Sequence, residues 1–110
     1  MKGIGCCQGV IKARVKVIRH PREAALKLGE IMVAEFTDPG WITLFANASG
    51  IIVERGSLLS HSAIVAREMG IPAIVAVDGI MSWLKSGDVV EMNGTTGFIR
   101  KIENEDEHDS

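Results

Sequence analysis

Histidine is the residue in this 110-residue chain best suited to nucleophilic chemistry, and among the three histidines only His61 has an informative setting. It follows Ser57-Leu58-Leu59-Ser60 and stands at the start of a segment, 60–69, with the pattern of a helix. Free backbone N–H groups and the helix dipole stabilise an anion at a helix N-terminus. Ser60 and Ser62 add hydroxyls for a phosphate oxygen, and a neutral imidazole is a nucleophile. The pattern makes His61 a candidate phosphoryl acceptor, whereas a histidine near a helix start is more often an exposed or capping residue.

The other candidate groups have simpler interpretations. His20 stands at a predicted helix entry and His108 lies in an acidic tail, and neither has a cluster of partners. Cys6 and Cys7 are adjacent, so a disulfide between them would be strained and would link no distant segments, and their spacing does not suit a zinc site. We therefore expect reduced thiols and no metal. Arg67 is interpreted as a surface charge or a structural ion pair. The chain has no glycine-rich phosphate loop with its lysine, so a nucleotide would have to bind elsewhere.

Alternating strands and helices would have to position His61. Strands are expected at 9–19, 30–36, 51–53, 71–77, 89–92 and 98–102, with a hairpin at Asn93-Gly94. Helices are expected at 20–28, 41–48 and 60–69, with a further helical turn at 80–84. This order predicts an α/β fold, with a mixed sheet and helices packed against it.

Length and composition restrict the class of protein. The chain has room for one domain, and 46% hydrophobic with 24% charged residues is typical of a globular protein. Five of the fourteen acids lie in 103–110, which we expect to be a disordered tail. Residues 1–102 carry a net charge of +3, twelve basic against nine acidic side chains, and these are scattered, so nucleic acid is not expected as a partner. No apolar run is long enough to span a membrane and no signal peptide is evident, so we expect a cytoplasmic protein.

A longer segment around His61 carries a family resemblance. Residues 56–75, GSLLSHSAIVAREMGIPAIV, resemble the phosphohistidine segment of the phosphoenolpyruvate (PEP)-utilising enzymes, which reads approximately GGxxSHxAIVARExGIPAVV. The similarity extends upstream through Thr37-Asp38-Pro39-Gly40-Trp41 and downstream through Gly94-Thr95-Thr96-Gly97. It covers about residues 7 to 102 and is nearest to the phosphoenolpyruvate synthase and rifampicin phosphotransferase branch.

The resemblance implies that residues 1–102 form a single swivelling β/β/α domain. In it, His61 would take a phosphoryl group, through Nε2, from an ATP-binding or PEP-binding partner domain and pass it to an acceptor such as pyruvate. Gly56, Ser57, Ser60 and Ser62 match the positions around the phosphate. This domain is expected to bind no cofactor alone, because ATP and Mg²⁺ belong to the partner domain. By itself it would be one component of a phosphotransferase and not a complete enzyme.

Two departures and two alternatives accompany this interpretation. Ser57 replaces the second glycine of the family pattern, which removes some backbone freedom near the phosphate. Leu59 stands where plant-type dikinases carry a regulatory threonine, so that switch is not expected here. The alternative functions are a stand-alone interaction module without catalysis and a simple anion-binding module at the helix start.

Overall fold

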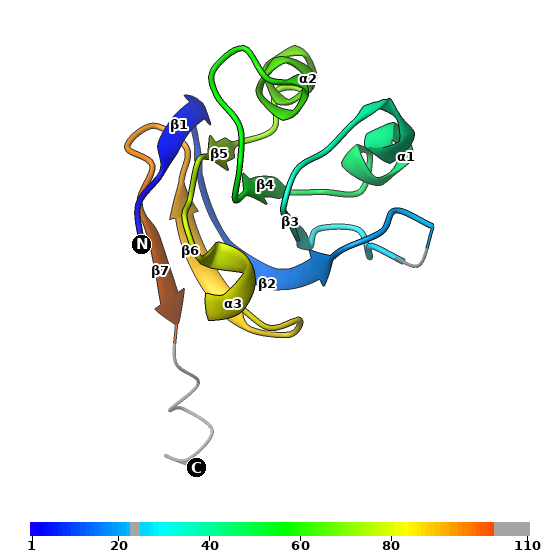
Figure 1. The fold of residues 1–110 in the computed structure, drawn as a ribbon. Coiled ribbons are helices and arrows are strands. Elements are labelled where there is room, and N and C mark those ends of the chain that lie inside the picture. The colour runs from blue at the N-terminus through cyan, green and yellow to red at the C-terminus, as the bar shows by residue number, and fades with distance from the viewer. Residues whose placement is uncertain (23–24, 103–110) are drawn as a thin grey trace.

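The buried apolar runs of the sequence form the centre of one curled sheet (Figure 1). The structure, a computed structural model, describes residues 1–22 and 25–102. The described strands are β1 (Ile4–Cys7), β2 (Val10–Ile18), β3 (Ile31–Ala34), β4 (Gly50–Val53), β5 (Ala73–Val75), β6 (Val89–Asn93) and β7 (Ile99–Ile102). Their spatial order is β1-β5-β4-β3-β2-β6-β7. Neighbours from β2 to β5 are parallel, whereas β1, β6 and β7 pair antiparallel, so the predicted mixed sheet is confirmed.

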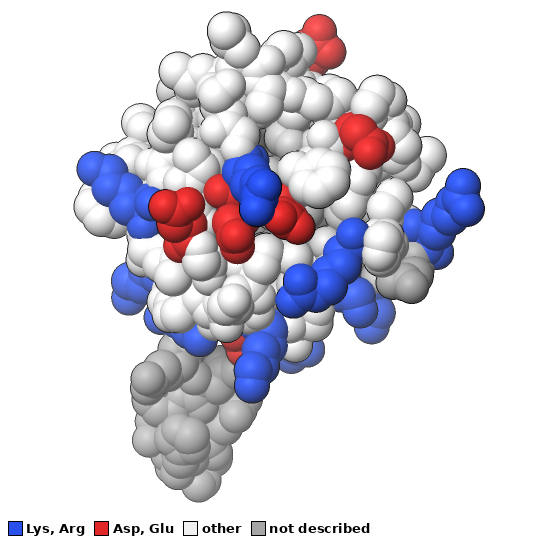
Figure 2. Space-filling view, viewed as in Figure 1, with Lys and Arg blue, Asp and Glu red and all other residues white. Residues whose placement is uncertain are grey.

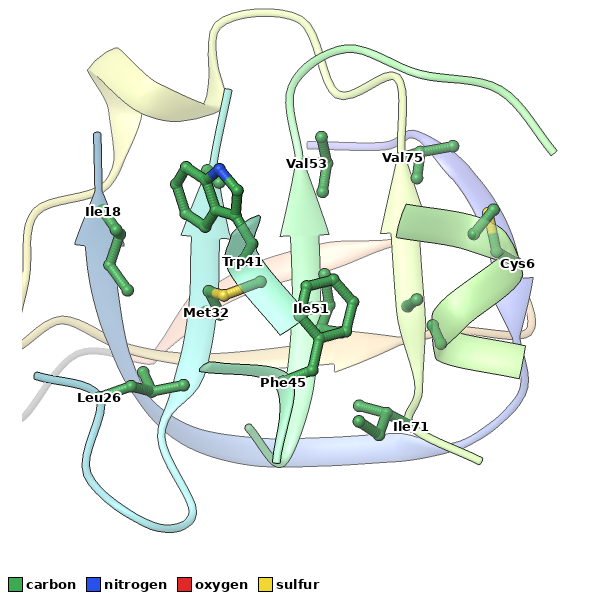
Figure 3. Packing of buried hydrophobic residues seen from close by; sticks show 14 residues of the cluster. Cys6, Ile18, Leu26, Met32, Trp41, Phe45, Ile51, Val53, Ile71 and Val75 are labelled. Carbon is green, nitrogen blue, oxygen red and sulfur yellow. The ribbon is translucent and has the colours of Figure 1, made fainter. Parts of the chain in front are cut away.

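The parallel strands are buried on both faces, which is why they are continuous apolar runs. Side chains alternate along each strand between two cores. Along β3, for example, Met32 packs into the core under the helices, and Val33 packs into the core inside the curled sheet. Figure 3 shows the first of these cores, where Trp41 and Phe45 pack over Met32 and Ile51.

In the described part of the chain, four short helical segments cover the sheet. The 3₁₀ helix η1 (Pro39–Trp41) continues into α1 (Ile42–Phe45), and these lie with α2 (His61–Met69) on one face of the parallel strands (Figure 1). Helix α3 (Ile80–Trp83) packs into the second core, which β6 and β7 close from the other side. The result is the β/β/α arrangement that the family resemblance implied.

The two ends of the strand order meet, so the sheet closes on itself. Lys2, just before β1, forms an antiparallel bridge with Phe98, just before β7. The N–H of Gly3 donates to the carbonyl of Gly97 at 2.8 Å across the same seam. Gly97 has φ +87°, a left-handed conformation that favours glycine, so the residue that closes the sheet also ends the β6–β7 turn.

One predicted helix is absent from the described residues, one strand was not predicted, and one turn is longer than predicted. Residues 21–22 and 25–29 of the predicted helix 20–28 form turns and irregular chain. Of these, only Leu26 is fully buried, so there is no apolar stripe to stabilise a helix. Strand β1 was not predicted, because Ile4–Cys7 has no alternating pattern and is held by pairing with β5. The predicted hairpin at Asn93-Gly94 is confirmed, but its turn extends to Gly97, and Asn93 Oδ1 accepts from two amides of that turn.

Other elements are shorter than their patterns indicated. The strands predicted at 30–36 and 71–77 are limited to β3 and β5, and the helix predicted at 41–48 ends at Phe45. None of the described helices is long and apolar enough to cross a membrane. Basic and acidic side chains are interspersed on the face in Figure 2. The predicted disordered tail, 103–110, lies outside the described residues.

Candidate functional site

His61 is the first residue of α2, and the surrounding groups leave the first turn of this helix open. Ser60 is the N-cap in an extended conformation, and its side chain makes no capping hydrogen bond. The first backbone bond of the helix runs from the Ile64 N–H to the Ser60 carbonyl at 3.0 Å. The N–H groups of His61, Ser62 and Ala63 therefore precede the hydrogen-bonded ladder, as the first donors of a helix do. Such a turn provides donors for an anion.

The His61 ring is held by Thr37, which sequence reasoning did not select. Thr37 Oγ1 lies 3.0 Å from Nδ1 of His61 and also contacts Oγ of Ser62 at hydrogen-bond distance. Thr37 is 9% exposed and Ser62 only 2% exposed, so this pair of hydroxyls is shielded from water. The ring of Phe45 lies edge-on to the imidazole, with centroids 6.0 Å apart at 75°. These contacts hold the ring from the Nδ1 side, and among the hydrogen bonds of residues 1–22 and 25–102 none involves Nε2.

Parallel pairing brings Thr37 to His61. Strands β3 and β4 are parallel neighbours, so their carboxyl ends lie at one edge of the sheet, where ligands commonly bind in α/β folds. The pairing continues past the strands, because the Arg55 N–H donates to the Glu35 carbonyl at 2.9 Å and the two side chains form an ion pair at 3.1 Å. Thr37 follows β3 and His61 follows β4 across this joined edge.

The loop 56–60 is folded by its own polar groups. Gly56 has φ +137°, and a β-carbon there would lie 3.0 Å from Oγ of Ser60. The Ser57 carbonyl accepts from both the N–H and the hydroxyl of Ser60, at 3.1 and 2.7 Å. The Ser57 hydroxyl accepts from the Leu59 N–H at 3.2 Å. Of the residues predicted to surround a phosphate, Gly56, Ser57 and Ser60 thus lie together in one exposed loop before His61, whereas the hydroxyl of Ser62 faces inward to Thr37.

Arg67, near the end of α2, contacts the same loop. Its Nη2 donates to the Leu58 carbonyl at 2.7 Å, a role that the surface-charge interpretation did not include. Burial raises the pKa of the nearby Cys6 thiol, and the positive charge of Arg67 offsets part of that rise. Both cysteines are free thiols, as expected from their adjacency.

His20 takes no part in these contacts. His20 lines a cavity of about 390 Å³, whose walls include Phe36 and Asp38 on either side of Thr37 but not His61. His108 falls outside the described residues. Within 1–22 and 25–102, no three His, Cys, Asp or Glu side chains gather closely enough to hold a metal ion.

Sequence reasoning could have found one of the missed residues. Thr37 is a hydroxyl residue shortly after a buried strand, and the strand–helix–strand order predicts that the next buried strand runs parallel beside it. Polar residues after both strands would then share an edge. Phe45 and the carbonyl of Leu58 carry no comparable signal, because their roles depend on packing and on a backbone group.

Comparisons with known proteins identify the family to which the chain is similar. The family described as "PEP-utilising enzyme, mobile domain" matches residues 26–97. Rifampicin phosphotransferase of Bacillus cereus is 40% identical over 100 residues, which is 91% of this chain and 12% of that protein. Phosphoenolpyruvate synthase of Aeropyrum pernix is 39% identical over 101 residues, 90% of this chain and again 12% of the relative. The chain therefore spans about an eighth of the length of these curated relatives.

Solved structures show the same fold. A solution structure of Enzyme I (nEIt) has a TM-score of 0.62 at 28% identity, covering 74% of this chain and 34% of that one. Aconitase X of Thermococcus kodakaraensis has a TM-score of 0.68 at 21% identity, over 93% and 97% of the two chains, which is a likeness of fold alone. The family match over most of the chain and the close relatives lead to one conclusion: this chain belongs to the mobile-domain family of the PEP-utilising enzymes.

Proposed function

We propose that this chain is a phosphohistidine carrier, in which Nε2 of His61 accepts a phosphoryl group and delivers it to a second site. The observation that carries this proposal is the contact between Thr37 Oγ1 and Nδ1 of His61 at 3.0 Å. It engages one ring nitrogen at the open first turn of α2 and leaves the other as the nucleophile. Membership of the PEP-utilising family supports the same chemistry.

The Thr37 contact determines which ring nitrogen of His61 carries the proton. For Nε2 to hold a lone pair in the neutral ring, Nδ1 must carry the proton and donate it to Thr37 Oγ1. The Thr37 hydroxyl then donates to Oγ of Ser62, which completes a chain of two hydrogen bonds. In the transfer, Nε2 forms a bond to phosphorus while the bond from phosphorus to the leaving oxygen breaks, and that oxygen keeps the electron pair. In the second transfer an acceptor oxygen attacks phosphorus and the Nε2–phosphorus bond breaks.

The loop and first turn supply donors to the transferred group. In this proposal the backbone N–H groups of Ser62 and Ala63 and the hydroxyl of Ser60 face the phosphoryl oxygens. Gly56 and Ser57 form the backbone that approaches the phosphate. Because the Ser62 hydroxyl is turned inward, we assign it to the hydrogen-bond chain of Thr37, and its amide to the phosphate.

Donor and acceptor lie on other domains or chains. The relatives by name act in rifampicin and phosphoenolpyruvate chemistry, and this chain spans only 12% of either. We propose that a partner domain binds ATP with Mg²⁺, or PEP, as the donor, and that pyruvate or a comparable small molecule is the acceptor. We place this transfer in the cytoplasm.

Phosphoramidate, a small donor that needs no partner domain, tests the carrier directly. The wild-type chain, His61→Ala and the control His20→Ala are incubated with it, and phosphate is located by intact mass and peptide mapping at alkaline pH. We expect acid-labile phosphate on His61 in the wild type and in His20→Ala, and none in His61→Ala. Equal labelling of His20 and His61, or no labelling, would contradict the proposal. Saturable binding of inorganic phosphate without covalent transfer would instead favour the anion-binding module.

A further inference from the structure

We infer that Arg67 is a positioning residue, which holds the loop 56–60 in the shape required for phosphorylation of His61. This inference rests on the proposed function. Its basis is the hydrogen bond from Arg67 Nη2 to the carbonyl of Leu58, at 2.7 Å. The two residues lie on opposite sides of His61 in the sequence, Leu58 three positions before it and Arg67 six positions after it.

The length of α2 shows what this contact does to the loop. Six residues of α-helix advance about 9 Å along the axis. Leu58 precedes the helix, and the long Arg67 side chain extends toward the helix N-terminus, where its Nη2 meets the Leu58 carbonyl. The guanidinium therefore fixes the direction in which the chain approaches His61, and with it the place of the Ser57 and Ser60 groups.

The loop has few other restraints. Among the described residues, its remaining hydrogen bonds join Ser57 to Leu59 and to Ser60, and the Ser60 carbonyl accepts from Ile64, so they shape the turn and attach it only at its junction with α2. Leu58 and Leu59 are 48% and 82% exposed, so their side chains add little packing. Among the hydrogen bonds of the described residues, the Arg67 contact is the one that ties positions 57–59 to a residue more than three positions away.

The positive charge of Arg67 also lowers the pKa of the Cys6 thiol in β1, against the rise that burial causes. Basic charge in the last turn of a helix is also favourable for the helix dipole. Arginine suits this position because its planar guanidinium presents several donors in a fixed geometry, whereas lysine offers a single ammonium on a flexible stem.

The test compares Arg67→Gln and Arg67→Lys with the control Arg55→Gln in the full chain. Arg55 is a matched control, because it is an exposed arginine next to the same loop and pairs with Glu35 instead of a loop carbonyl. Three quantities are measured: the rate of His61 phosphorylation by phosphoramidate, amide hydrogen exchange at residues 57–60, and the unfolding midpoint in urea.

We expect Arg67→Gln to slow phosphorylation about three- to tenfold, the range for losing one partly exposed charged hydrogen bond. Exchange at 57–60 should accelerate, while the unfolding midpoint stays near that of Arg55→Gln. Arg67→Lys should recover part of the rate. Wild-type exchange at 57–60 in Arg67→Gln, or a wild-type rate, would overturn the inference. If the wild type itself is not labelled, the proposed function fails, and the exchange data still decide whether Arg67 holds the loop.

Discussion

Replacing Thr37 by valine removes one hydroxyl and almost no volume, so it isolates the hydrogen-bond chain from Ser62 to His61. The valine methyl group leaves the hydroxyl of Ser62 without its partner at a site only 2% exposed. An unsatisfied buried polar group costs about 1–3 kcal/mol. We therefore expect Thr37→Val to lower the free energy of unfolding by about 1–3 kcal/mol. It should also slow phosphorylation of His61 about tenfold, the effect of losing about 1.4 kcal/mol of ring positioning.

The double variant Thr37→Val/Ser62→Ala gives a sharper test of the stability term. When both partners of a buried hydrogen bond become apolar, the change is nearly neutral. We expect the double variant to be at least as stable as Thr37→Val alone, although it has lost a second polar group. Urea unfolding of the wild type, both single variants and the double variant measures the coupling energy, which should be about 1 kcal/mol or more. The phosphorylation rate of the double variant should remain low, because Nδ1 still lacks its acceptor.

Two results would refute this reasoning. Additive stability effects, within about 0.5 kcal/mol, would mean that the two hydroxyls do not depend on each other. A wild-type phosphorylation rate in Thr37→Val would mean that the ring of His61 does not need Thr37. Nitrogen NMR of the imidazole provides an independent check, since it distinguishes protonated from unprotonated ring nitrogens. In the wild type the proton should reside on Nδ1, and in Thr37→Val the two tautomers should mix.

Three further perturbations test the fold and the loop. Gly97→Ala should lower the free energy of unfolding, measured in urea, more than Gly87→Ala does. Both glycines have positive φ, but only at Gly97 does backbone lie close to the position of an added β-carbon. For Gly87→Ala we expect a loss of about 1 kcal/mol. Gly56→Ala, at φ +137°, should slow labelling of His61 at least several-fold while retaining a cooperative unfolding transition; unchanged labelling would show that the loop tolerates a side chain. Burial raises the pKa of the Cys6 thiol above its ordinary 9.0, so the folded state keeps this proton to higher pH than the unfolded state. That stabilisation is complete below pH 9.0 and is lost as the pH rises through the folded pKa, so unfolding midpoints between pH 8 and 10 should fall more steeply in the wild type than in Cys6→Ala.

The parts of the fold that could be predicted are those in which burial dictates residue type. Strands β3, β4 and β5 are buried on both faces, and β-branched or aliphatic runs such as Ile51-Ile52-Val53 have few other uses in a domain of this size. Helix α2 was predicted with its start and end, because His61 follows a serine cap and Gly70 takes the left-handed conformation that ends a helix.

The parts that could not be predicted are those in which tertiary contacts decide. The alanine-rich segment 20–28 favours a helix locally, yet of its described residues only Leu26 is fully buried, so propensity without packing was not enough. Strand β1 presents the opposite case, because a short piece with a glycine and two cysteines becomes a strand through pairing with β5. In both segments the conformation depends on tertiary contacts, which are few in 20–28 and are present for β1.

The candidate site shows why residue type predicts chemistry more readily than orientation. The sequence places Ser60 and Ser62 symmetrically about His61, and both appeared suited to a phosphate. On a helix, however, residues two positions apart point in different directions, so Ser62 faces the core while Ser60 remains in the loop. The inward hydroxyl of Ser62 needs a hydrogen-bond partner. Thr37, which follows β3, supplies it and also contacts His61. The hydroxyl of Thr37 thus serves both Ser62 and the imidazole, so Thr37→Val alone should lower stability and reactivity together, whereas the further change Ser62→Ala should offset only the loss of stability.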